Sequence, residues 1–338
     1  MVWFERQYTQ SQGENKQIHR ADSFALPSTT NPRTFDTMTS PIRAVFLFLL
    51  GLSLLQGCRE SNVPTPENPD GFSLTRGSSS FNFDMPEGSQ APTLDILYHI
   101  PATGDIADMP ILFVFHGADR NAAAYLEAWK TLAEARHCMV FAPVILDSDY
   151  PGSRGYQQGN MVNAAGQTLP QPAWLFSAIE PLFDEVLSRT GAPKVDYDLW
   201  GHSGGAQFVH RFVLFGQPQR LGQAVAANAG WYTVPENDAN FPYGLGGSPI
   251  NEAELATPFS LPLHIHLGTE DTAFNDTAWE GAFAQGDNRF ERGQYFFAHA
   301  QLTASNWGIS CAWSLMEVAG VGHHAEGMAE AAAAMLYP

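Results

Sequence analysis

From residue 81 onward, the pattern of apolar and polar positions switches repeatedly between strand-like and helix-like periods. Alternation at every second residue over 80–85 and 93–100 predicts half-buried strands. Continuous apolar runs, as at 110–115, predict strands of a parallel sheet that are buried on both faces. The predicted strands cover 80–85, 93–100, 110–115, 139–144, 196–200, 223–229, 261–267 and 313–318.

Helical spacing of apolar residues separates most of these strands. The predicted helices pass through 125–136, 175–190, 206–213, 294–305 and 325–336. Strands that alternate with helices predict an α/β fold in which helices cover both faces of a mostly parallel sheet of about eight strands. Two long loop-rich segments, 147–172 and 235–260, interrupt the pattern, and long loops of this kind are often functional.

The chain before residue 81 has a different character. Residues 1–37 are polar without apolar periodicity, and we interpret them as a disordered or non-native extension ahead of a start at Met38. Residues 38–57 combine a short basic start with a run of about a dozen apolar residues, which is typical of a signal peptide rather than a membrane span. Residues 58–80 are rich in Pro, Ser and Gly and indicate a flexible tether to a folded body at 81–338.

Composition limits the classes of binding partner and the kinds of cysteine site that the chain can have. Of 338 residues 44% are hydrophobic and 15% charged, which indicates a globular protein. The formal net charge of −18 argues against a nucleic-acid partner, because phosphate binding needs clustered Lys and Arg. The three cysteines stand apart in sequence, so no Cys-x-x-Cys metal or redox motif is present.

The strongest chemical signal is Gly-x-Ser-x-Gly over 201–205, between an apolar strand and an amphipathic helix. Such a turn holds a serine in a strained conformation with its hydroxyl exposed, which predicts Ser203 as a nucleophile. The alternative is a purely structural turn. A serine hydroxyl needs a base, and the base needs an orienting carboxylate. Asp271 and His323 each follow a predicted strand, in the chain order Ser, acid, His.

Neighbouring residues compete for these two roles. Glu270 and Asp276 are alternatives to Asp271, and His324 is an alternative to His323. His202 is interpreted as a packing residue.

Four motifs together resemble those of an α/β-hydrolase over about 81–338: His116-Gly117, the 201–205 turn, the Gly268–Asp271 segment and Gly322-His323. Within that family, the chain is most similar to polyhydroxybutyrate-depolymerase-like and feruloyl-esterase-like serine esterases. The resemblance implies that His323 accepts the Ser203 proton and that Asp271 orients the imidazole. It implies an oxyanion hole formed by the N–H groups of Gly204 and Ala118, with His116 structural. It also implies that Cys138 and Cys311 lie too far apart to bridge, as two free, buried thiols.

The apolar run before 58 ends in Leu-Gln-Gly-Cys, which resembles the lipobox of bacterial lipoproteins. That resemblance implies lipidation of Cys58 and anchoring outside the cytoplasm, at the outer membrane.

Three further hypotheses concern binding. Trp231 and Tyr232 follow a strand end and could line a cleft for an aromatic or polymeric ester; ordinary packing is the alternative. His264 and His266 share one strand face, yet no second metal motif accompanies them, so we expect no metal and no cofactor. The predicted function is a serine esterase, and a serine peptidase of the same fold or a non-catalytic binding protein remain alternatives.

Overall fold

The computed structural model describes residues 73–274 and 280–338. The expected polar extension, the signal peptide, Cys58 and most of the tether lie outside these residues, as does Asp276. The first strand begins at Gly77, so the last four residues of the expected tether are already in the sheet. No helix within the described ranges is both long and apolar enough to span a membrane.

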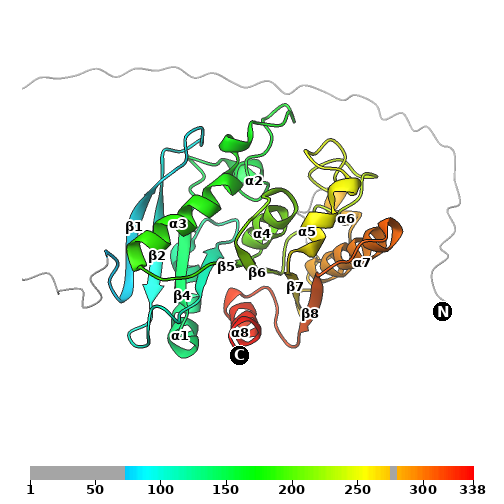
Figure 1. The fold of residues 1–338 in the computed structure, drawn as a ribbon. Helices are drawn as coiled ribbons and strands as arrows, with labels where there is room; N and C mark the ends of the chain where they lie inside the picture. Colours follow the sequence, from blue (N-terminus) through cyan, green and yellow to red (C-terminus); the bar gives the residue numbers. More distant parts are fainter. Residues whose placement is uncertain (1–72, 275–279) are drawn as a thin grey trace, which may run out of the picture. The chain divides into compact units, whose positions relative to one another are not determined.

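Eight strands form one sheet in the order β1-β2-β4-β3-β5-β6-β7-β8 (Figure 1). The first two pair antiparallel, as do β2 and β4, and every later pair is parallel, which confirms the predicted α/β-hydrolase architecture. The bounds are β1 Gly77–Asp84, β2 Thr93–Ile100, β3 Ile111–Phe115, β4 Met139–Val144, β5 Tyr197–His202, β6 Leu221–Ala227, β7 Leu263–Gly268 and β8 Ser314–Val318.

Helices cover both faces of this sheet (Figure 1). One apolar cluster joins α1 and α8 to the face that carries Leu112, Val114 and Trp200. A larger cluster packs α3, α4 and α7 against the opposite face. The longer helices are α1 Ala122–Arg136, α3 Ile179–Thr190, α4 Gly204–Phe215, α7 Arg289–Trp307 and α8 Ala325–Leu336; the short ones are α2 Gly152–Gly155, α5 Ala256–Ser260, α6 Glu280–Phe283 and the single 3-10 turns Gln171–Ala173, Leu175–Ala178 and Glu252–Glu254.

The order of the strands in the sheet also explains why Cys138 and Cys311 do not form a disulfide. Cys138 immediately precedes β4 and Cys311 lies shortly before β8, and four strands (β3, β5, β6 and β7) lie between β4 and β8. Both thiols are free, as predicted. Cys138 is buried, but Cys311 is only partly buried, so the expectation of two buried thiols is wrong for Cys311.

Candidate active site

Ser203 lies at the turn between β5 and α4 with φ 56° and ψ −114°, a conformation that costs a non-glycine residue on the order of 1–3 kcal/mol. The flanking glycines make this turn possible. A Cβ atom on Gly201 would come to 2.3 Å from the carbonyl oxygen of Gly205, and one on Gly205 to 2.0 Å from that of Phe115. The strand, the helix and the neighbouring strand β3 therefore approach too closely for any larger residue.

Ser203, His323 and Asp271 come together from three separate strand ends. His323 Nε2 lies 3.0 Å from Ser203 Oγ, and His323 Nδ1 lies 2.7 Å from Asp271 Oδ2. These distances place the imidazole between the hydroxyl, which donates to Nε2, and the carboxylate, which accepts from Nδ1–H. Asp271 is buried, whereas the His323 side chain is 30% exposed and so remains open to a substrate.

The rival residues do not join this arrangement. Glu270 is exposed, and His324 is the exposed N-cap residue of α8. His202 is buried beside the site, with its ring centroid 4.6 Å from that of His323 and its Nδ1 3.1 Å from Tyr125 Oη. Burial lowers the pKa of His202 well below its usual value, so this ring is neutral and packs against the imidazole of His323.

Residues 117–118 lie directly against the first residue of α4. A Cβ atom on Gly204 would come to 2.8 Å from the backbone nitrogen of Ala118. The Gly204 N–H is among the first N–H groups of the helix, which have no acceptor within the helix. Both predicted oxyanion donors thus sit beside Ser203, where helix-end N–H groups stabilise developing negative charge.

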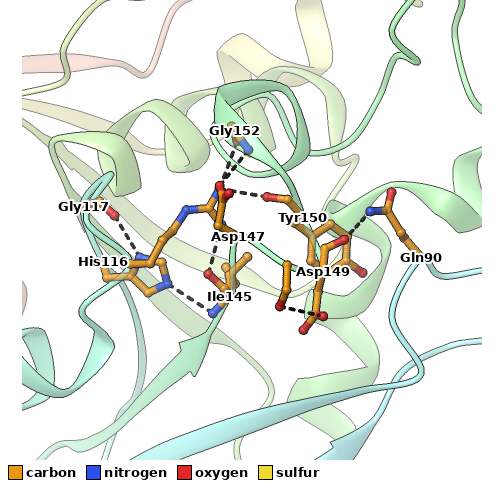
Figure 2. Close-up of polar contacts among 10 residues, drawn as sticks. Gln90, His116, Gly117, Ile145, Asp147, Asp149, Tyr150 and Gly152 are labelled. Carbon is orange, nitrogen blue, oxygen red and sulfur yellow. Dashed lines mark hydrogen bonds and ion pairs between the residues drawn. The ribbon is translucent and has the colours of Figure 1, made fainter. Parts of the chain in front are cut away.

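His116 holds this donor loop in place, as Figure 2 shows. Burial lowers the pKa of His116 to about 4, so the ring is neutral. Its Nε2 accepts a hydrogen bond from the Ile145 N–H at 3.2 Å, so Nδ1 carries the proton and donates to the Gly117 carbonyl at 3.0 Å. The structure thus gives His116 a contact that fixes the backbone directly before Ala118.

Arg289 is a neighbour of the acid that the sequence did not reveal. It opens α7, and its Nη1 donates to Asp271 Oδ1 at 3.2 Å. Both carboxylate oxygens of Asp271 are therefore hydrogen-bonded, one to His323 and one to Arg289. No motif surrounds Arg289. The packing of α7 beside β7, and a hydrogen bond from the Phe290 N–H to the Asp271 carbonyl at 3.3 Å, bring it to the acid.

The two aromatic candidates, Trp231 and Tyr232, differ in how far they are exposed. Tyr232 is fully buried and stacks on Phe296 at 4.5 Å, so its expected place in a cleft is wrong. Gln285 binds both backbone groups of Tyr232 and holds this segment inside the core. Trp231 is partly exposed, with the Arg211 guanidinium 4.3 Å from its ring centre, and stays a prediction as a substrate contact.

The two histidines of β7, His264 and His266, have different surroundings. His264 Nδ1 lies 2.7 Å from Ser314 Oγ, and His266 is fully buried with a pKa lowered to about 4 by burial. Over 73–274 and 280–338, no three His, Cys, Asp or Glu side chains gather as a metal site would require.

Comparison with solved structures gives two informative neighbours. Poly(aspartic acid) hydrolase-1 from Sphingomonas sp. KT-1 is 37% identical with a TM-score of 0.74, and the match covers 78% of this chain and 100% of that one. LpqC, a poly(3-hydroxybutyrate) depolymerase from Bordetella parapertussis, is 28% identical with a TM-score of 0.71, over 78% of this chain and 89% of that one. No family model matches the sequence, and no curated protein matches it either.

Proposed function

Because the chain belongs to the α/β-hydrolase family, we propose that Ser203, His323 and Asp271 are its catalytic triad and that its substrate is a polymeric ester, the class of polymer for which the neighbour LpqC is named. One observation carries the proposal of the triad. The hydrogen-bonded series from Ser203 Oγ through His323 to Asp271 has distances of 3.0 and 2.7 Å. A serine, a base and a buried carboxylate in this geometry are what acyl transfer requires.

In the proposed reaction, Ser203 Oγ attacks the ester carbonyl carbon while its proton moves to His323 Nε2. The N–H groups of Ala118 and Gly204 hydrogen-bond to the oxyanion that forms. The intermediate then collapses, the carbon–oxygen bond to the alcohol breaks, and His323 protonates the leaving alcohol. Water repeats the attack on the acyl-enzyme, with His323 again accepting the proton, and frees the acid and Ser203.

The triad is tested by Ser203→Ala with p-nitrophenyl butyrate as substrate. Loss of the nucleophile should lower kcat at least about a thousandfold, because the rest of the triad cannot act alone. Ser148→Ala is the matched control, since Ser148 is exposed and, among the described residues, its hydroxyl hydrogen-bonds to Asp149 alone. Equal activity of Ser203→Ala and the wild type would contradict the triad.

A cavity of about 680 Å³ supports a polymeric substrate. It lies between the two long loop segments, with Arg154 and Gln158 on one side and Asn240 and Pro242 on the other. Arg211 fastens both sides to α4, because its guanidinium donates to the carbonyls of Gln157 at 3.1 Å and Pro242 at 3.5 Å.

Arg211, which holds the two loop segments that line the cavity, is distant from the nucleophile along α4. Arg211 follows Ser203 by eight residues, which corresponds to about 12 Å along a helix axis. A hydroxybutyrate unit has four backbone atoms where an amino acid has three, so its extended repeat is about 4.6 Å and about three units would span this distance. We therefore assign the cavity to distal units of a polymer chain, beyond the reach of a small ester.

Ala164→Trp, which fills the cavity from its rim, tests this assignment. KM for long poly(3-hydroxybutyrate) oligomers should rise about tenfold or more, since blocking a subsite removes binding energy of at least about 1.4 kcal/mol. Kinetics with p-nitrophenyl acetate should not change. Ala165→Trp is the control, because Ala165 is also exposed but does not line the cavity. A parallel change with long and short substrates would refute the assignment.

A second candidate reaction is cleavage of an amide bond. The neighbour that is 37% identical is named for hydrolysis of poly(aspartic acid), whose units are joined by amides. The same triad serves both reactions, and they differ in the leaving group that His323 must protonate. Comparing rates on poly(aspartic acid) with rates on hydroxybutyrate oligomers, with Ser203→Ala as the blank, separates the two.

We also propose that the folded body is anchored through a lipid on Cys58 and acts outside the cytoplasm, at the outer membrane. The support is the sequence alone, namely the apolar run of the signal peptide followed by Leu-Gln-Gly-Cys.

A further inference from the structure

Asn228 occupies an unusual position at the centre of the sheet edge that carries the triad. It directly follows β6, which lies between the serine strand β5 and the acid strand β7. The residue is fully buried and has φ 49°, a left-handed conformation that asparagine tolerates better than most residues. A buried amide needs partners for both its oxygen and its nitrogen.

The partners of Asn228 lie on the two segments that carry the acid and the base. Its Oδ1 accepts a hydrogen bond from the Gly268 N–H at 2.8 Å, and its Nδ2 donates to the Gly322 carbonyl at 3.0 Å. Gly268 lies three residues before Asp271, and Gly322 immediately precedes His323. One side chain therefore bridges the backbones from which the acid and the base project.

The nucleophile is linked to the same point of the chain. The Ser203 N–H donates to the carbonyl of Ala227, the residue before Asn228, at 3.0 Å. The dipeptide 227–228 thus touches all three triad segments.

The segment 319–323, which carries His323 and is called the base segment below, makes few other hydrogen bonds to this part of the sheet. Val318 and Val321 carbonyls accept hydrogen bonds from Thr269 and Glu270, which joins the base segment only to the acid segment. Within the described residues, Asn228 Nδ2–Gly322 O is the only hydrogen bond from the backbone of 319–322 to any element that precedes β7. It therefore restrains the backbone before His323 relative to β6 and the nucleophile elbow.

We propose that Asn228 is a positioning residue that sets the distance between Ser203 and His323, an inference that rests on the proposed function. His323 stands on a loop, and its imidazole must keep Nε2 at hydrogen-bond distance from Ser203 Oγ. A misplacement of about 1 Å in such a constellation can cost about a hundredfold in rate.

Asn228→Asp tests the proposal with almost no change in shape. The aspartate still accepts from the Gly268 N–H, but its second oxygen faces the Gly322 carbonyl with no proton between two acceptors. We expect kcat for p-nitrophenyl butyrate to fall about ten- to a hundredfold with KM changed less than about twofold. Protonation of this buried aspartate restores a donor, so the ratio of variant to wild-type kcat should rise as the pH is lowered.

Asn160→Asp is the matched control. Asn160 is also buried and left-handed, with φ 54°, and its Nδ2 donates to the Ala173 carbonyl at 2.9 Å. It lies in the 147–172 segment, and within the described part of the chain its hydrogen bonds go to Ala173 and Arg154, not to a triad segment. We expect this control to lose thermal stability while kcat stays within about twofold of wild type, because no catalytic group moves.

Two measurements separate positioning from folding and from the proposed function. Circular dichroism and thermal unfolding show whether Asn228→Asp folds. The low-field proton resonance of His323 Nδ1–H, bound to Asp271, reports the geometry without any turnover; it should shift in Asn228→Asp and not in Asn160→Asp. Wild-type kcat and an unshifted resonance in folded Asn228→Asp, at a pH high enough to ionise the introduced carboxyl, would overturn the proposal. An inactive wild type would instead refute the proposed function, and the resonance would still test the placement.

Discussion

At the scale of single residues, Asp198 shows how the fold partly buries a carboxylate away from the active site. It lies on β5, five residues before Ser203. Its Oδ1 accepts from the Gln223 N–H at 2.8 Å and its Oδ2 from the Tyr337 hydroxyl at 2.9 Å. Burial raises the pKa of Asp198 to about 6 despite these two hydrogen bonds, which favour the charged form.

This shift predicts a dependence of stability on pH. The folded pKa of about 6 exceeds the unfolded value of 3.8, so the folded state binds the proton more tightly. The contribution is fully present below about pH 4 and is lost as the pH rises through about 6, up to about 3 kcal/mol in total. An asparagine side chain cannot titrate, so Asp198→Asn should gain stability relative to wild type between pH 4 and 8.

Urea unfolding at several pH values measures the difference between the two proteins, in which the contributions of other titrating groups cancel. Asp196→Asn, an exposed carboxylate just before the same strand, is the control, and its stability difference from wild type should change less over this range. A constant difference for Asp198→Asn would refute the predicted shift.

The placement of residues was predictable where it is tied to a motif. Ser203, Asp271 and His323 follow strand ends in a recognisable order, and the structure brings the three together. Tyr232 was misplaced because adjacency to a strand end does not say on which side a ring will pack. Asn228 escaped because its role depends on a left-handed backbone and two remote carbonyl and N–H partners, which no local pattern encodes.

At the scale of elements, the apolar periods predicted every strand but not the residues at which strands and helices begin and end. The strand expected over 80–85 extends back to Gly77, since Ser78 and Ser79 pair with β2 although they lack apolar side chains. The helix expected over 294–305 begins at Arg289, where Asn288 caps it by accepting from the Glu291 N–H. Backbone pairing and capping thus extend strands and helices beyond the residues whose apolar periodicity predicts them.

The loop segments show the limit of periodicity more clearly. Segment 147–172 was expected to be irregular, yet it contains α2 and a bridge between Val162 and Thr168. Arg211, fully buried, organises it together with the second loop segment through hydrogen bonds to their backbone carbonyls. A buried arginine in an amphipathic helix gives no sequence signal of this role, because its partners are carbonyl groups that every residue has.

At the scale of the whole molecule, the proposed lipid anchor can be tested directly. Cells fed a labelled fatty acid should incorporate it into the wild-type chain and into Ser203→Ala, but not into Cys58→Ser, because the thiol is the acceptor. Cys58→Ser should keep the esterase rate of the folded body, whose first strand begins at Gly77. Incorporation of the label into Cys58→Ser would contradict the anchor.

The separation of the triad along the chain has a consequence for biosynthesis. Ser203 and His323 are 120 residues apart, and Asp271 and His323 are 52 apart. A chain emerging from the ribosome therefore contains the proposed nucleophile long before the proposed base. Contacts between such distant residues form late, because the ends of a long loop must first be brought together. Hydrolytic activity is thus withheld from the nascent chain, and its appearance marks the moment when the carboxyl-terminal part of the sheet has docked.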